Sequence, residues 1–124
     1  MPMPEIKCFK AADRTFETYM GSPDRPEKDY ARIAKLVGPE ISQSMGGGVV
    51  TYRKLTAPWS LPFDELVVVL DGAFTVTSAG KAYDCVAGDV LWFPAHTPLT
   101  YEVADFVTVF YAKHPVGLTA AVPS

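Results

Sequence analysis

Glu65 is the residue of this sequence best placed to do chemistry, because it stands directly before the aliphatic run of residues 66–70. Side chains alternate along a strand, so an inward-facing Glu65 would share its face with Val67 and Val69. A carboxyl group in an apolar interior either becomes neutral or is held charged by a cation or by hydroxyl donors. Glu65 could therefore act as a general acid or base, and the alternative is a structural hydrogen bond.

Aromatic, apolar and basic side chains could surround this acid and bind a small ligand. Aromatic rings stack on ligands and their polar atoms form hydrogen bonds, although most aromatic residues serve in core packing. The candidate ligand-binding residues are Tyr52, Lys54, Trp59, Leu61, Trp92, Leu99, Tyr101 and Tyr111, and Lys113 is a further candidate to hold Glu65 charged. Arg53 and Lys54 are adjacent in a predicted strand, so one of them should face inward. The inward residue could neutralise the carboxylate or phosphate group of a ligand. The alternative is a solvated pair on the surface.

Metal-ligating side chains are few and do not have ligand spacing. Catalytic zinc and iron sites need about three protein donors, whereas His96 falls in a predicted loop and His114 precedes Pro115. We therefore predict no metal site and no cofactor. The alternative is a metal-dependent enzyme whose ligands would be drawn from Glu65, Asp64, His96 and tyrosines.

The sequence contains no motif for nucleotide binding or nucleophilic catalysis. The glycine run of residues 46–48 leads into Val49 and so does not form the G-x4-G-K-[ST] phosphate loop. The chain also has no G-x-S-x-G elbow and no neighbouring Cys–His pair. The glycines are better explained by a sharp entry into a strand or by close backbone packing.

Short strands punctuated by glycine and proline would have to position these residues. Residues 30–37 fit either a helical face or a strand, and the Gly38-Pro39 pair that follows favours the strand. Asp71-Gly72 is expected to end the strand of residues 66–70, and residues 78–81 to form a hairpin turn. The other predicted strands are residues 49–55, 74–77, 82–86, 90–93, 99–103 and 106–113. This regular series predicts an all-β sandwich or barrel.

A chain of 124 residues is the usual size of one domain. We predict an irregular N-terminal arm at residues 1–29, the barrel at residues 30–115 and a C-terminal tail at residues 116–124. If Glu65 faces inward, the apolar side chains of Leu66, Val68 and Leu70 face outward and need a cover. We therefore predict a homodimer.

Composition excludes several classes of partner. The net charge is −3 and the longest basic cluster is the pair Arg53-Lys54, so neither nucleic acid nor an anionic membrane is an expected partner. The N-terminus lacks the basic-then-apolar order of a signal peptide, which predicts a cytoplasmic protein. Two cysteines, Cys8 and Cys85, form no CxxC motif and are expected to be reduced and largely buried thiols rather than a disulfide.

Two spaced motifs resemble those of the cupin superfamily. Glu65 is followed by six residues and then Gly72, and Gly88 is followed by five residues and then Pro94. The resemblance implies the cupin double-stranded β-helix, a jelly-roll barrel. It also implies that the histidine positions of the cupin metal site hold apolar side chains here, namely Trp59, Leu61 and Leu99.

Residues 44–48 (SMGGG) and 58–65 (PWSLPFDE) are similar to EutQ-type ethanolamine-utilisation proteins, a branch of the cupins, over about residues 44–112. This resemblance implies acetate-kinase-like chemistry, which would require ATP and Mg²⁺, and an association with bacterial microcompartments. The sequence therefore predicts a EutQ-like cupin that binds a small polar or carboxylate metabolite, with acid–base or kinase-like chemistry at Glu65. The alternatives are a non-catalytic ligand-binding or scaffold cupin and a metal-dependent enzyme with non-standard ligands.

Overall fold

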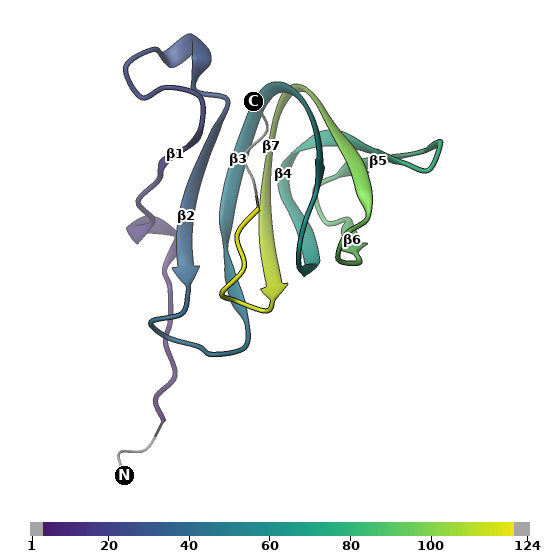
Figure 1. The fold of residues 1–124 in the computed structure, drawn as a ribbon. Helices are drawn as coiled ribbons and strands as arrows, with labels where there is room; N and C mark the ends of the chain where they lie inside the picture. Colours follow the sequence, from purple (N-terminus) through teal and green to yellow (C-terminus); the bar gives the residue numbers. More distant parts are fainter. Residues whose placement is uncertain (1–3, 121–124) are drawn as a thin grey trace.

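The computed structural model describes residues 4–120, and strands make up most of this part of the chain (Figure 1). No helix in it is long and apolar enough to span a membrane. Two short 3-10 helices, Ala11–Asp13 and Pro26–Lys28, lie near the N-terminus. The strands are β1 (Glu17–Met20), β2 (Ala31–Val37), β3 (Gly46–Ser60), β4 (Asp64–Ser78), β5 (Lys81–Val86), β6 (Val90–Phe93) and β7 (Pro98–His114).

All strand pairs are antiparallel, and their order in the sheet is β1-β2-β3-β7-β4-β5, with β6 paired to β4. The long strands β3, β4 and β7 bend over at one end, so the sheet curls around its own interior (Figure 1). A long antiparallel sheet that curls in this way buries one face and leaves the other outside. The predicted all-β jelly-roll barrel is confirmed, as are the strand predicted at residues 30–37 and the hairpin turn at residues 78–81.

Bulges, which insert an extra residue into a strand, produce the bends. The prediction that Asp71-Gly72 ends a strand is wrong, because β4 continues through this pair with register shifts on either side of it. Gly72 has φ +75°, and a Cβ there would collide with the carbonyl oxygen of Phe106 on β7. Because β7 passes through the facing bulge, the two strands predicted at residues 99–103 and 106–113 are one.

A second bulge lies on β3 at Lys54, which has φ +46°, and the register with β7 shifts between Arg53 and Leu55. The bulge interrupts the alternation of side chains, so Arg53 and Lys54 are both exposed. The guanidinium carbon of Arg53 lies 5.7 Å from the ring centre of Phe106. The expectation that one member of this pair faces inward is therefore wrong.

The N-terminal arm predicted as irregular contains a strand. Residues 17–20 form β1, which pairs with β2 and extends the sheet by one edge strand. The apolar Met20 is buried, so this segment gains packing as well as backbone hydrogen bonds. At the other end of the chain, Val116 is buried and its backbone N–H donates to the carbonyl oxygen of Ser44 at 2.9 Å. Residues 1–3 and 121–124 of the predicted arm and tail lie outside the described residues.

The interior follows the alternation predicted for β4. Glu65, Val67 and Val69 are buried, whereas Leu66 and Leu70 are each 43% exposed. The core also contains a cluster of rings around Tyr101, whose ring centre lies 5.1 Å from Phe74, 5.2 Å from Trp59 and 5.4 Å from Tyr52. The face of β4 that carries Glu65 is therefore the inside of the barrel.

Both described cysteines are free thiols, as predicted. Cys85 is buried on β5, and burial raises the pKa of its thiol. Cys8 is exposed, so the expectation that both thiols are largely buried is wrong for this one. The N-terminal segment places Cys8 ahead of the first strand, where no core covers it.

Candidate functional site

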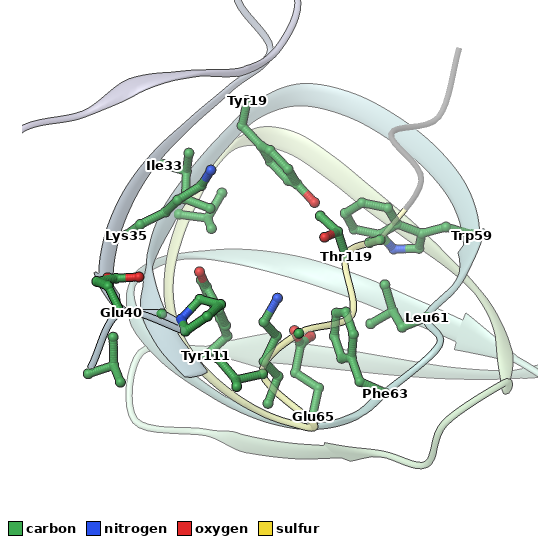
Figure 2. A pocket seen from close by; sticks show the side chains of 18 of the residues that line it. Tyr19, Ile33, Lys35, Glu40, Trp59, Leu61, Phe63, Glu65, Tyr111 and Thr119 are labelled. Atoms are coloured by element: carbon green, nitrogen blue, oxygen red, sulfur yellow. The ribbon is translucent and has the colours of Figure 1, made fainter. Parts of the chain in front are cut away.

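A cavity of about 350 Å³ opens into the barrel beside Glu65. Figure 2 looks into this cavity and shows side chains pointing inward from the surrounding strands. Five strands and the segment after β7 contribute to its wall. The lining residues are Tyr19 of β1, Ile33, Lys35 and Val37 of β2, Gly38, Pro39 and Glu40 after it, Val50, Tyr52 and Trp59 of β3, Leu61 and Phe63 before β4, Glu65 of β4, Tyr111 and Lys113 of β7, and Val116, Gly117, Thr119 and Ala120.

Glu65 is the buried carboxylic acid of this cavity, with 8% of its surface exposed. It lies near the start of β4, directly opposite Lys113 on β7 and Phe93 on β6. Burial raises the pKa of Glu65 from 4.5 to about 7, and the positive charge of Lys113 acts in the opposite direction. Its carboxyl group therefore exchanges a proton close to neutral pH.

Lys113 is the cation closest to this acid in strand register, yet it does not form a direct ion pair with it. In residues 4–120 the ion pairs are Arg32–Asp29 and Lys35–Glu17. The Nζ atom of Lys113 instead donates to the carbonyl oxygen of Leu118 at 2.7 Å and lies 4.9 Å from the ring centre of Phe63. Burial lowers the pKa of the Lys113 ammonium, and the charge of Glu65 opposes this shift.

Two tyrosine hydroxyl groups point into the cavity, one from Tyr19 and one from Tyr111 (Figure 2). Burial, with a smaller contribution from the charge of Glu65, raises the pKa of each to about 12. Both hydroxyls therefore stay protonated at neutral pH and can donate or accept a hydrogen bond. They could orient a polar ligand without changing their own charge.

Apolar side chains form the opposite wall. Trp59, Leu61 and Phe63 lie together on one side of the cavity, across from Lys35 and Glu40 (Figure 2). The Trp59 ring packs edge-on against Tyr52, with ring centres 6.2 Å apart. Within the described part of the chain its Nε1 atom is buried without a hydrogen-bond partner. The cavity thus has one charged, hydroxyl-bearing side and one apolar side.

The structure brings six of the residues predicted for a site together in this cavity, and these are Glu65, Tyr52, Trp59, Leu61, Tyr111 and Lys113. Leu99 and Tyr101 are buried in the core behind Trp59 and do not line the cavity. Trp92 lies on the outer face of β6 and is 58% exposed. In the pairing of β6 with β4, Trp92 is opposite Leu66, whose side chain faces outward. Lys54 is also outside, at the bulge of β3. Contrary to expectation, Trp92 and Lys54 therefore do not line this cavity.

Sequence reasoning missed several lining residues. Lys35 is in phase with the buried Ile33 on β2, so strand alternation could have placed it on the inner face. Tyr19 lies in a four-residue strand within the segment predicted to be irregular, where only a short β-branched and aromatic stretch marks it. Thr119 carries no local signal, because the turn after β7 alone brings it to the cavity.

The metal site considered as an alternative is not assembled. Asp64 and Glu65 are neighbours on β4 and so face opposite sides, and the Oδ1 atom of Asp64 accepts a hydrogen bond from the Ala95 backbone N–H at 2.9 Å. His96 is exposed in the loop before β7. From residue 4 to residue 120, no group of three His, Cys, Asp or Glu side chains is placed to hold a metal ion.

Comparisons with known proteins agree on one family. The family model described as ethanolamine utilisation protein EutQ matches residues 13–119. A relative from Escherichia coli (strain K12), named acetate kinase EutQ, is 27% identical over 94 residues, which are 76% of this chain and 40% of that protein. The chain spans about half the length of the curated relatives it matches, from 40% to 55%.

Solved structures show the same fold. The crystal structure of a putative ethanolamine utilization protein Q from Salmonella typhimurium LT2 superposes with a TM-score of 0.77 at 23% identity, over 90% of this chain and 87% of that one. A RmlC-like cupin from Shewanella frigidimarina superposes with a TM-score of 0.70 at 14% identity, over 93% and 95% of the two chains. At these identities the structures establish the cupin fold alone. With the family match over most of its length, the chain belongs to the EutQ family of ethanolamine utilisation proteins.

Proposed function

We propose that the barrel cavity binds a small organic anion and that the carboxyl group of Glu65 exchanges a proton with it. The observation that carries this proposal is a buried carboxyl group in a cavity that also contains an ammonium group without a carboxylate partner. When Glu65 is protonated, the charge of Lys113 is free to attract a carboxylate or phosphate group. Lys35 also lines the cavity, but its ammonium group is paired with Glu17 at 3.6 Å, so Lys113 is the lining lysine without a carboxylate partner in the described part of the chain.

The size and lining of the cavity support a small ligand with an apolar body. Ligand sites usually have volumes of about 300–1,000 Å³, and this cavity has about 350 Å³. An anionic group would lie near Lys113 and Tyr111, and the body of the ligand would pack against Trp59, Leu61 and Phe63. This arrangement joins one charged contact to a larger apolar contact, as in most small-molecule sites.

The pKa of Glu65 supports acid–base chemistry as well as binding. A general acid or base works best when its pKa is close to the operating pH, and burial raises this pKa to about 7. The hydroxyl groups of Tyr19 and Tyr111 point into the same cavity as Glu65 (Figure 2) and could orient a ligand there. Glu65 is therefore our candidate catalytic residue.

Phosphoryl transfer to acetate is a second candidate function, supported by the name of the curated relatives. Acetate is a small carboxylate, which is the class of ligand proposed for the cavity. ATP and Mg²⁺ would then be co-substrates, and Glu65 and Glu40 are the lining carboxylates that could contribute oxygen ligands to the ion. A coupled assay with acetate, ATP and Mg²⁺ tests this directly. Phosphorylation that persists in Glu65→Gln would remove Glu65 from the reaction.

Fluorescence of Trp59 can test the proposed binding. The chain has two tryptophans, and Trp92→Phe leaves only the one that lines the cavity. This variant should be titrated with acetate and benzoate, with acetamide and benzamide as uncharged controls. We expect saturable changes with the acids, weaker binding of the amides, and a loss of affinity of about tenfold or more in Lys113→Met. If no acid produces a saturable change, the proposal is wrong.

The pH dependence separates a functional Glu65 from a structural one. An anion should bind more weakly as the pH rises through about 7, because ionised Glu65 repels it. Glu65→Gln has no charge to gain, so its affinity should stay constant over the same range. Equal pH dependence in the two proteins would favour the alternative, a ligand-binding or scaffold cupin in which Glu65 has only a structural role.

We also propose that a second copy of the chain covers the outer face of the sheet. This face carries exposed apolar side chains from β4, β5 and β6. A partner must therefore be equally apolar, and the same face of a second copy meets that requirement through a two-fold axis. The residues concerned are Leu66, Leu70, Val86, Val90 and Trp92.

A further inference from the structure

Glu65 and Lys113 belong to a row of residues that crosses three neighbouring strands. Gly46 on β3 is opposite Lys113 on β7, and Lys113 is opposite Glu65 on β4. Residues directly opposite each other in antiparallel strands place their side chains on the same face of the sheet. Gly46 therefore lies on the cavity face, next to Lys113 and on the side away from Glu65.

The space over Gly46 is filled by Lys113. A Cβ atom added to Gly46 would lie 3.2 Å from the Cε atom of Lys113 and 3.0 Å from the Cγ2 atom of Val116. Both distances are shorter than ordinary van der Waals contacts, so the side chain of Lys113 leans over the glycine. From this position its Nζ atom reaches the carbonyl oxygen of Leu118 at 2.7 Å.

Backbone conformation does not explain a glycine at this position. The glycines with positive φ are Gly21, Gly72, Gly80 and Gly88. Gly46 is in the β conformation at the start of β3, where glycine weakens a strand because it has no side chain to pack. The reason that remains is the occupied space over Gly46, which the side chains of Lys113 and Val116 and the backbone oxygen of Val37, 3.3 Å from an added Cβ atom, fill.

The next row on the same face repeats the arrangement. Gly48 is opposite Tyr111, and a Cβ atom on Gly48 would lie 2.8 Å from the Tyr111 hydroxyl oxygen. The same atom would also lie 2.6 Å from the backbone oxygen of Ala34, so a side chain at Gly48 would move the backbone. At Gly46 the two shortest contacts are with side-chain atoms and the backbone contact, with the Val37 oxygen, is longer at 3.3 Å, which makes Gly46 the better position for an experiment.

We propose that Gly46 is a positioning residue: the absence of its side chain gives Lys113 room to lean away from Glu65, so that the two charges do not pair and neutralise each other. The functional meaning of this inference rests on the proposed function, because a free Lys113 can attract an anion and an unpaired Glu65 can exchange a proton. The geometry itself can be tested without any ligand.

Glu65 is coupled electrostatically to groups on three strands, and its charge raises the pKa of the tyrosines among them. Lys113, Tyr111 and Tyr101 lie on β7, Tyr19 on β1 and Tyr52 on β3. Lys113 is the cation that lowers the pKa of Glu65, and Lys35 of β2 acts on Lys113 in turn. A shift in the position of Lys113 should therefore change the protonation of Glu65 more than a shift in any tyrosine.

The test is the pKa of Glu65, measured by ¹³C NMR titration of its carboxyl carbon in the full chain. In Gly46→Ala the methyl group should push Lys113 towards Glu65 and lower this pKa by about 1 pH unit or more, as expected for an opposite charge that moves into contact. Lys113→Met should raise the pKa, because the attracting charge is lost. The double variant should match Lys113→Met, since Gly46 acts through Lys113.

Gly47→Ala is the matched control. Its Cβ atom would point to the other face, 3.6 Å from the Phe110 ring and 3.0 Å from the Tyr111 backbone oxygen. This variant should lose stability without a change in the pKa of Glu65, so a general effect of adding a methyl group can be recognised. Circular dichroism and urea unfolding would show that each variant is folded.

The proposal is overturned if the pKa of Glu65 in Gly46→Ala equals or exceeds that of the wild type, or if the double variant differs from Lys113→Met. Should Gly46→Ala not fold, Lys113→Met still decides: an unchanged pKa would show that Lys113 has no influence for Gly46 to control. These outcomes do not depend on ligand binding. The positioning role and the proposed function can therefore fail separately.

Discussion

Glu65 and Lys113 lie directly opposite each other on β4 and β7, but the ammonium group of Lys113 donates its hydrogen bond to the Leu118 carbonyl oxygen and not to the carboxylate. A buried acid without a direct cationic partner ionises with difficulty. Its pKa is accordingly raised from 4.5 to about 7. The protein therefore keeps a proton-exchanging group at a cost to its own stability.

The first prediction concerns stability and pH. Glu65 binds its proton more tightly in the folded protein than in the unfolded chain, so its contribution to stability is fully present below pH 4.5 and is lost as the pH rises to about 7. The loss should be about 3 kcal/mol across this window. Urea denaturation at a series of pH values measures it. Glu65→Gln should lack this component, and an unchanged slope in the variant would contradict the buried acid.

The second prediction compares two glycines with the same backbone angle. Gly72 and Gly80 both have φ +75°. A Cβ atom on Gly80 would meet nothing within 4 Å, whereas one on Gly72 would collide with the Phe106 backbone. Gly80→Ala should therefore cost only the left-handed conformation, about 1–2 kcal/mol. Gly72→Ala should cost clearly more by urea denaturation, and equal costs would show that the β4 bulge does not pack as described.

The third prediction concerns Tyr101, which the sequence placed in the ligand site. Tyr101 is 1% exposed and lies among the rings of Tyr52, Trp59 and Phe74. Tyr101→Ala should lower the free energy of unfolding by about 3–5 kcal/mol, as for other large aromatic residues in a core. Tyr83→Ala, at an exposed position on β5, is the control and should cost far less. Similar losses would place Tyr101 outside the core.

The fourth prediction tests the proposed dimer. Leu66→Lys introduces a charge in the middle of the outer apolar face, where Leu66 is 43% exposed and opposite Trp92. Burying an unpaired charge is costly, so sedimentation should show a dimer for the wild type and a monomer for the variant. Ile41→Lys changes a residue with 41% exposure in the loop after β2 and should remain a dimer. If the wild-type protein sediments as a monomer, the proposed dimer is wrong.

Local sequence patterns were sufficient to predict which side chains of the strand at residues 65–69 face the interior and where one hairpin turn lies. The alternation of Glu65, Val67 and Val69 placed these residues inside because it depends only on the pleat of a strand. The turn at residues 78–81 was also readable, since a Gly in its second half allows positive φ. The interior position of Trp59 and Leu61 followed from the same phase as Glu65.

Tertiary structure decided which side chains reach the cavity. The bulge at Lys54 turned a basic residue outward, and the register of β6 against β4 placed Trp92 on the outer face. Neither the bulge nor the register can be predicted from the local sequence, because each depends on the neighbouring strand in the sheet. Tyr19 and Thr119 reach the cavity from the two ends of the described chain. The sequence alone determined most of the strands, the buried acid and two of its neighbours, Tyr111 and Lys113, whereas long-range strand pairing determined where the Lys113 ammonium group lies, that Tyr19 reaches the cavity, and the free space around that acid.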